Sequence, residues 1–175
     1  MPESLSPRVG IVMGSDSDWP KIQSAARALA EFDVPYEVRV MSAHRTPEAV
    51  RQYATDAMGR GMKVLIAAAG GAAHLAGVLA SHTTLPVIGV PVPTELAGGL
   101  DSLLSIVQMP GDVPVATVGA GGGGPRNAGL LAVQILAIGD PTLQQKLIAF
   151  KRALVDKVAA KDAALQKTLQ TEKRG

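Results

Sequence analysis

Short apolar runs alternate along the chain with longer segments in which apolar residues recur at helical spacing. The runs predict buried strands and the spaced segments predict amphipathic helices. We expect strands at residues 8–13, 34–41, 64–69, 86–90 and 113–118. We expect helices at residues 21–31, 47–59, 73–81, 102–107, 127–138 and 142–170.

This alternation is typical of a parallel sheet whose strands are joined by right-handed crossover helices. We therefore expect an α/β fold, a three-layer αβα sandwich with a central parallel sheet and a long C-terminal helix. One domain is expected over residues 1–175, with the sandwich at about 8–138 and the C-terminal helix at 140–170. In such a sheet the loops after the strands share one edge, where ligands bind.

Four loops after expected strands carry candidate chemistry, and the first of them is GSDSD at 14–18. Ser15, Ser17 and the following helix N-terminus can offer hydroxyl and N–H groups to an anion. Asp16 and Asp18 are carboxylates, which suit the vicinal hydroxyls of a ribose. Plain helix capping is the alternative, and the pentad alone favours it, since Ser and Asp are common N-cap residues.

The second loop, SAHRTP at 42–47, places a histidine beside an arginine. Arg45 presents a planar fork that matches a phosphate, and His44 can accept or give a proton near neutral pH. Each residue alone is more often a surface or core residue. Together on a ligand-edge loop, with Ser42 before them, they favour a functional site. Thr46 is the expected N-cap of the next helix.

The third loop, GGAAH at 70–74, follows the continuous apolar run VLIAAA. Its small residues, Gly70, Gly71, Ala72 and Ala73, leave room for a ligand to approach the backbone. His74 would start the next helix, whose positive end disfavours an imidazolium, so we expect a neutral ring that makes a hydrogen bond. Tight packing of helix on sheet explains the same letters equally well.

The remaining candidates are weaker. His82 lies between a helix and the following strand, hence at the opposite edge of the sheet. The fourth loop contains GAGGGG at 119–124, but a dinucleotide-binding fingerprint would open the first strand–helix unit. We expect this glycine run to form a close-fitting or mobile loop.

Composition and charge exclude several classes of protein. Hydrophobic residues make up 47% of the chain and charged residues 18%, which is typical of a globular protein. Residues 140–175 hold eight Lys and Arg against four Asp and Glu, without interleaved aromatics, so we expect no nucleic-acid partner. Cysteine is absent and no compact ligand set such as HExxH occurs, so no metal site is expected.

No apolar stretch is long enough for a transmembrane helix, and the first residues show no signal-peptide pattern. A cytoplasmic protein without membrane contact is the expectation.

Taken together and in order, these loops resemble the PurE family of purine biosynthesis, specifically its bacterial type, the N5-carboxyaminoimidazole ribonucleotide mutases. The arginine in SAHRTP favours this type, because the animal type, which carboxylates with free CO2, usually has lysine there and lacks GGAAH. The matching text is MGSDSD (13–18), SAHRTP (42–47), AGGAAHL (69–75), LPVIGVPV (85–92), LDSLLSIVQMPGDVPVAT (100–117) and NAGLLAVQIL (127–136).

The resemblance implies a flavodoxin-like fold, a homo-octamer and no cofactor. It implies that a carboxylate moves from the exocyclic nitrogen of an aminoimidazole ribonucleotide to ring carbon C4, by decarboxylation and recarboxylation. His44 matches the general acid/base, and His74 matches a supporting histidine. The implied substrate-binding residues are Ser15 and Asp18 (ribose hydroxyls for Asp18), Ser42 and Arg45 (5′-phosphate), and the backbone of Gly70, Gly71, Ala72 and Ala73.

Two departures from the family pattern stand out. Ala76 occupies a position where the family usually has proline, and the segment Gly119–Arg126 is richer in glycine than usual.

A rival hypothesis is a flavodoxin-like binding module that holds a nucleotide or flavin phosphate without chemistry. The 3% aromatic content argues against flavin, whose ring usually needs a stacking partner.

The C-terminal helix carries an apolar stripe that must be covered by something. It packs either on its own subunit or on a neighbour, and the resemblance favours the neighbour. The stripe consists of Leu143, Leu147, Leu154, Val155 and Val158.

Overall fold

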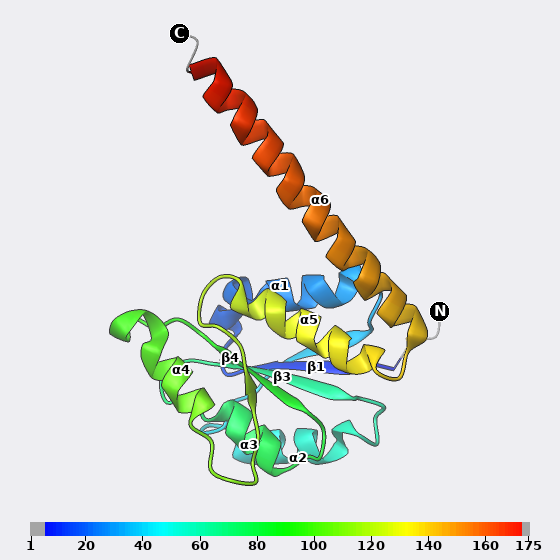
Figure 1. Cartoon of the computed structure of the whole chain (residues 1–175). Helices are drawn as coiled ribbons and strands as arrows, with labels where there is room; N and C mark the ends of the chain where they lie inside the picture. Colours follow the sequence, from blue (N-terminus) through cyan, green and yellow to red (C-terminus); the bar gives the residue numbers. More distant parts are fainter. Residues whose placement is uncertain (1–5, 173–175) are drawn as a thin grey trace. The chain divides into compact units, whose positions relative to one another are not determined.

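A computed structural model of the chain describes residues 6–172 (Figure 1). The chain divides into two compact units, the first ending at Leu136 and the second beginning at Ala137. The first unit is an α/β sandwich. The second contains the helix α6, Pro141–Glu172. No helix in the described part of the chain combines the length and the apolar character needed to cross a membrane.

A parallel sheet with the strand order β2-β1-β3-β4-β5 forms the centre of the first unit. The inner strands β1, β3 and β4 are buried along their whole length, as expected for a parallel sheet covered on both faces. This order is that of flavodoxin-like folds, so the expected fold class is confirmed. The strands are β1 (Val9–Met13), β2 (Tyr36–Val40), β3 (Val64–Ala69), β4 (Val87–Pro91) and β5 (Ala116–Thr117).

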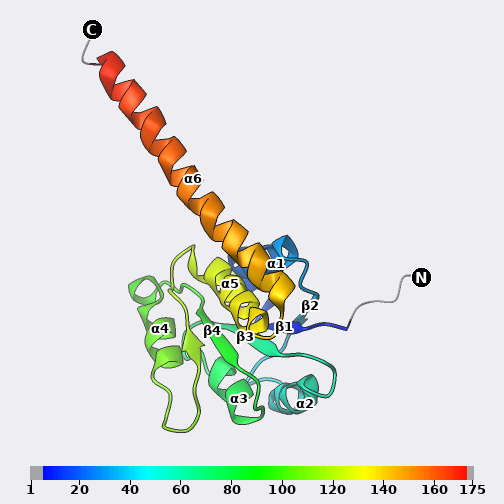
Figure 2. The same ribbon diagram turned by 45° about the vertical axis from the view of Figure 1, so that its right-hand side comes forward.

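Helices cover both faces of this sheet (Figures 1 and 2). One face carries α1 (Trp19–Glu31) and α5 (Gly124–Ala137). The other face carries α2 (Pro47–Ala57), α3 (Leu75–Ser81) and α4 (Leu100–Val107). Two short 3₁₀ turns, η1 (Asp16–Asp18) and η2 (Leu96–Gly99), precede α1 and α4.

Small residues bring the helices close to the sheet and to each other. A methyl group on Gly89 of β4 would overlap Ile106 of α4, so the helix lies directly on the strand. A methyl on Gly129 of α5 would lie 2.5 Å from the carbonyl oxygen of Ala25 in α1. The core is therefore built from aliphatic side chains and close backbone contacts, consistent with the low aromatic content.

Most element boundaries lie within about two residues of those predicted from sequence, and two differ by more. β5 contains only two residues instead of 113–118, because Pro114 has no N–H for the ladder and pairing is limited to Ala116 and Thr117. α5 begins at Gly124 instead of residue 127, with Pro125 in its first turn, a favoured position for proline.

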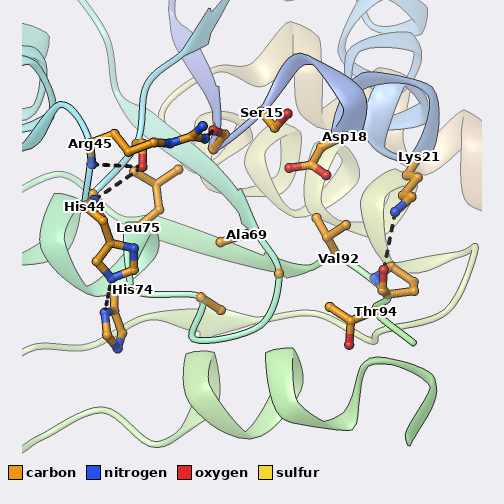
Figure 3. A pocket seen from close by; sticks show the side chains of 16 residues that line it. Ser15, Asp18, Lys21, His44, Arg45, Ala69, His74, Leu75, Val92 and Thr94 are labelled. Carbon is orange, nitrogen blue, oxygen red and sulfur yellow. Dashed lines mark hydrogen bonds between the residues drawn. The ribbon is translucent and has the colours of Figure 1, made fainter. Parts of the chain in front are cut away.

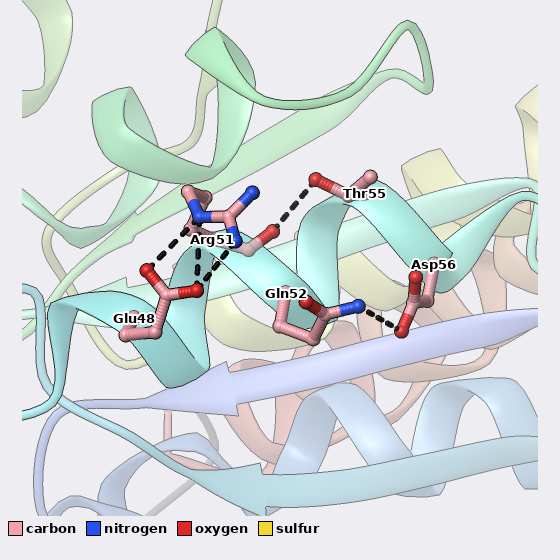
Figure 4. Close-up of polar contacts among 5 residues, drawn as sticks. All are labelled: Glu48, Arg51, Gln52, Thr55 and Asp56. Carbon is pink, nitrogen blue, oxygen red and sulfur yellow. Dashed lines mark hydrogen bonds and ion pairs between the residues drawn. The ribbon is translucent and has the colours of Figure 1, made fainter.

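The exposed side of α2 is organised by contacts one helical turn apart (Figure 4). The guanidinium of Arg51 donates to both carboxylate oxygens of Glu48, and the amide of Gln52 donates to Asp56 at 2.7 Å. Glu48 lies in the first turn, where a negative charge interacts favourably with the helix dipole. These exposed contacts support the helix that follows the SAHRT turn without involving the histidine or arginine of that turn.

Candidate active site

A cavity of about 610 Å³ lies where the carboxyl ends of the strands meet (Figure 3). Loops after β1, β2, β3 and β4 line it, so segments far apart in sequence share one hollow. This is the edge at which doubly wound sheets bind ligands, near the switch point between β1 and β3.

The loop after β1 divides its polar groups between capping and the cavity. The Ser15 hydroxyl caps η1 by accepting from the Ser17 N–H at 3.3 Å, and Asp16 Oδ1 accepts from the same N–H at 3.0 Å. Asp18 stands at the N-cap position of α1 but makes no capping hydrogen bond. Its carboxylate faces the cavity instead (Figure 3). Ser15 and Asp16 therefore make capping contacts and Asp18 makes none, while Ser15 and Asp18 both line the cavity.

The environment of Asp18 shifts its acidity. Burial raises the pKa of this carboxyl above its ordinary value, because a charged carboxylate loses water contacts there. The ammonium of Lys21, one turn further along α1, acts in the opposite direction. Lys21 also lines the cavity, and its Nζ donates to the carbonyl oxygen of Pro93 at 3.4 Å.

The loop after β2 is a turn closed by its own polar groups. The Ser42 N–H donates to Thr46 Oγ1 at 2.9 Å, while the Thr46 N–H and hydroxyl both donate to the Ser42 carbonyl. The Ser42 hydroxyl accepts from the N–H groups of His44 and Arg45 at 3.3 and 3.2 Å. Thr46 is the N-cap residue as expected, but its hydroxyl closes the turn and does not cap the helix.

Arg45 connects the first two loops. One of its terminal N–H groups donates to the Gly14 carbonyl at 2.8 Å. A guanidinium has five N–H donors in a fork, so the remaining ones can serve an anion in the cavity. The same contact fixes the direction of the side chain, since Gly14 directly follows β1, the strand next to β2.

The loop after β3 brings the second histidine to the first. His44 Nε2 lies 2.7 Å from His74 Nδ1, and the two rings meet edge to face with centroids 4.7 Å apart. Only one of the two facing nitrogens can carry the hydrogen of this contact. The tautomer of each ring therefore depends on the other. When the hydrogen on His44 Nε2 changes, the hydrogen-bonding role of His74 Nδ1 must change with it.

Most of the predicted site residues meet in the cavity. Ser15, Asp18, Ser42, His44, Arg45, Gly70, Ala73 and His74 all line it. Gly71 does not, and its N–H is turned to the hydroxyl of Ser102. Ala72 lines a neighbouring cavity of about 400 Å³. His82 lies outside the main cavity, as expected from its position.

The fourth loop predicted to contribute to the site does not line the cavity, and the loop after β4 lines it instead. The glycine run 121–124 follows β5, the far edge strand, and contributes nothing to the lining of the main cavity. The loop after β4 lines it instead, through Val92, Pro93 and Thr94. This loop and Lys21 could not be recognised from the sequence, because neither displays a chemically distinctive motif. The signal was positional: one follows a buried strand and the other lies one turn beyond Asp18.

Within residues 6–172, no group of three or more His, Cys, Asp or Glu side chains is gathered in a way that could hold a metal ion. The polar groups of the cavity are suited instead to an anion (Arg45), to hydroxyls (Asp18) and to proton exchange (His44 and His74).

The family model for AIR carboxylase (AIRC) matches residues 8–157. The chain belongs to this family. Its type within the family is that of the N5-carboxyaminoimidazole ribonucleotide mutases, so the PurE resemblance is confirmed.

Relatives with that name match nearly the whole chain. The N5-carboxyaminoimidazole ribonucleotide mutase of Mycobacterium tuberculosis is 63% identical over 166 residues, 95% of this chain and 94% of the relative. The mutase of Synechocystis sp. is 54% identical over 164 residues, 94% and 92% of the two chains. Among solved structures, PurE of Treponema denticola is 29% identical with a TM-score of 0.81, covering 91% of this chain and 98% of the other.

Proposed function

We propose that the protein converts N5-carboxyaminoimidazole ribonucleotide to 4-carboxy-5-aminoimidazole ribonucleotide in purine biosynthesis. Its relatives at 54 and 63% identity, which cover most of the chain, carry the name of this mutase. The observation that carries the proposal is that Asp18, His44 and Arg45 line one cavity. In the proposal, one sugar phosphate bound there contacts all three side chains. The reaction is an isomerisation without net oxidation or reduction, and we expect it to proceed without a cofactor.

In this proposal the nucleotide is held at points remote from the reacting carbon. Arg45 binds the 5′-phosphate with the help of Ser42 and Ser15, because its fork matches two phosphate oxygens. Asp18 accepts hydrogen bonds from the ribose hydroxyls. The imidazole ring then lies against the small residues of the 70–73 loop, beside the histidines. Binding energy from phosphate and ribose thereby orients the reacting ring.

The chemistry needs one proton early and returns one late. Protonation of the carbamate nitrogen allows its bond to the carboxylate carbon to break, which releases CO2 and leaves an enamine-like aminoimidazole. Carbon C4 attacks the CO2 to form the new carbon–carbon bond. Loss of the proton that remains on C4 restores the aromatic ring. One proton enters and one leaves, so substrate and product are isomers.

His44 is the proposed acid and base for both transfers. Its contact with His74 supports this role, because a partner at 2.7 Å fixes the ring and can take up the change in hydrogen bonding when His44 gains or loses a proton. The small side chains around the ring, including Ala43, Ala69 and Ala73, leave room for CO2 close to C4. His74 is thus a supporting residue in the proposal.

A direct assay tests the function. Purified protein is given either the carbamate substrate or free aminoimidazole ribonucleotide with bicarbonate, and the ultraviolet absorbance is followed. The mutase consumes the carbamate at a rate independent of added bicarbonate. Turnover with only the free ribonucleotide and bicarbonate would identify a carboxylase instead. If the absorbance changed with neither substrate, the protein would be a binding module without mutase or carboxylase activity.

We further propose that the protein is a homo-octamer in which α6 contacts a neighbouring subunit. Of the predicted stripe, Leu143 is buried, whereas Val155 and Val158 are 69 and 66% exposed. With Leu154, Leu165 and Leu169 they recur on one face at helical spacing, which indicates a surface that another chain covers. Light scattering on a chain that ends at Asp140 tests this. The truncated chain should form an assembly with fewer subunits, and an unchanged number of subunits contradicts the proposal.

A further inference from the structure

Ser102, in the first turn of α4, is a polar residue with none of its surface exposed. Its hydroxyl accepts a hydrogen bond from the Gly71 N–H at 2.9 Å and donates one to the Val92 carbonyl at 2.8 Å. A hydroxyl has one hydrogen, so the short Val92 bond takes it, and Asp101 Oδ1 at 3.5 Å is a weak competitor. Ser102 does not line the cavity, and its hydroxyl bonds neither His44 nor His74.

The two bonds of Ser102 join the ends of neighbouring strands. Gly71 belongs to the loop after β3, and Val92 directly follows β4. The Val92 N–H donates to the Ala69 carbonyl at 2.9 Å, so Val92 continues the pairing of these strands. Because α4 lies directly on β4, it carries the Ser102 hydroxyl into the space between the two strand ends.

The loop that Ser102 holds has a backbone that needs support. Gly71 and Ala73 have positive φ values of 67° and 47°. Alanine disfavours this region because its Cβ crowds the backbone, and such a conformation persists only where surrounding contacts impose it. The loop has no polar side chain before His74, so its anchor must come from another element. Inside the loop, the Ala73 N–H donates to the Gly70 carbonyl at 3.2 Å.

The position of His74 follows from this backbone. The residue comes directly after Ala73, and its ring must reach His44 Nε2 at 2.7 Å. We infer that Ser102 is a positioning residue, whose hydroxyl holds the loop 70–74 so that His74 meets His44. The kinetic part of this inference rests on the proposed function. The contact between the two rings does not.

Three variants test the inference by kinetics. Ser102→Ala removes the hydroxyl, and Ser102→Cys keeps a side chain of similar volume with a weak hydrogen-bonding group. Ser81→Ala is the control, at an exposed serine that ends α3 and lies outside the main cavity. For both Ser102 variants we expect kcat and kcat/KM to fall together by about 100-fold with little change in KM, because the catalytic pair is misplaced while phosphate and ribose contacts remain. Ser81→Ala should keep wild-type values.

A spectroscopic readout separates this inference from the proposed function. The imidazole nitrogens of His44 and His74, observed by NMR in the ligand-free protein, report the shared hydrogen directly. Both Ser102 variants should lose the wild-type signature and Ser81→Ala should retain it, whether or not the wild-type protein shows mutase turnover. Unchanged imidazole signals in Ser102→Ala would overturn the positioning role. Wild-type kcat in Ser102→Cys would overturn it as well, since packing volume and not the hydroxyl would then be what matters.

Discussion

The two loops that carry the histidines reach the same contact by different means. The turn 42–46 is closed by hydrogen bonds among its own residues, chiefly between Ser42 and Thr46. The loop 70–74 consists of glycine and alanine before its histidine, adopts positive φ at two positions, and is tied to a serine 31 residues further along the chain. One is locally determined and the other is held from a distance.

The difference follows from what each loop must do. A turn that presents His44 and Arg45 has room for polar residues on either side. Their side chains hydrogen-bond to the nearby backbone and close the turn with a small loss of conformational entropy. A loop that lets a ligand ring approach its backbone must consist of residues with small side chains. It therefore has no polar side chains of its own to hydrogen-bond its backbone in place. The compactness of the 70–74 loop makes its geometry dependent on α4.

The largest expected effect comes from removing the acid/base at the point where the loops meet. His44→Asn should retain substrate binding and lower kcat by about 10²- to 10⁴-fold, because asparagine cannot exchange a proton. Steady-state kinetics and equilibrium binding measure the two quantities, and His82→Asn, outside the cavity, is the control. Near-normal turnover in His44→Asn would remove the acid/base role.

A smaller effect is expected at Arg45, in the same turn. Arg45→Ala should chiefly raise KM, since loss of a charged hydrogen bond to phosphate typically costs roughly 1.5–3 kcal/mol. Arg51→Ala, an exposed arginine that contacts Glu48 on α2, should leave KM unchanged. An unchanged KM in Arg45→Ala would exclude the phosphate role and leave the turn with His44 as its functional residue.

Removing hydrogen bonds from the turn 42–46 tests whether it is less sensitive to change than the loop 70–74. Thr46→Val keeps the shape of the side chain but removes its two hydrogen bonds with Ser42. We expect kcat to fall by less than about tenfold, because the turn is solvent-exposed and the Ser42 hydroxyl still holds the N–H groups of His44 and Arg45. A loss as large as that in Ser102→Ala would show that the two loops are equally fragile.

The smallest effect extends the comparison to the loop after β1, where burial sets the behaviour of Asp18. Its raised pKa means that the folded state binds the proton more tightly than the unfolded state. The free energy of unfolding therefore falls as pH rises from the ordinary pKa of 3.8 through the raised value. Asp18→Asn should lack this fall in urea titrations at a series of pH values.

Lys21→Met sharpens that measurement. The variant removes the cation that opposes the effect of burial, so the pKa of Asp18 should rise further and the fall in stability should extend to higher pH. Identical pH profiles for wild type and Lys21→Met would mean that Lys21 does not act on Asp18.

Much of the site could be predicted because local chemistry and chain order agree. A histidine and an arginine after one strand, a carboxylate after another and a glycine-rich loop after a third lie at the same edge of a parallel sheet, where ligands bind. The loop at 92–94 and Lys21 could not be found in this way, since their side chains become informative only beside the cavity. The glycine run was wrongly included because the sequence does not say which strand lies at the far edge.

By itself the sequence determined the parallel αβα sandwich, the edge of the sheet that holds the site, and the turn that presents His44 and Arg45, because these depend on hydrophobic period and on neighbours within a few residues. Only the tertiary structure decided that His44 and His74 touch, that Asp18 is turned from capping to the cavity, and that Ser102 holds the loop between them. Such contacts join residues about 30 positions apart, and their geometry is set by how closely a helix lies on a strand, which no local pattern records.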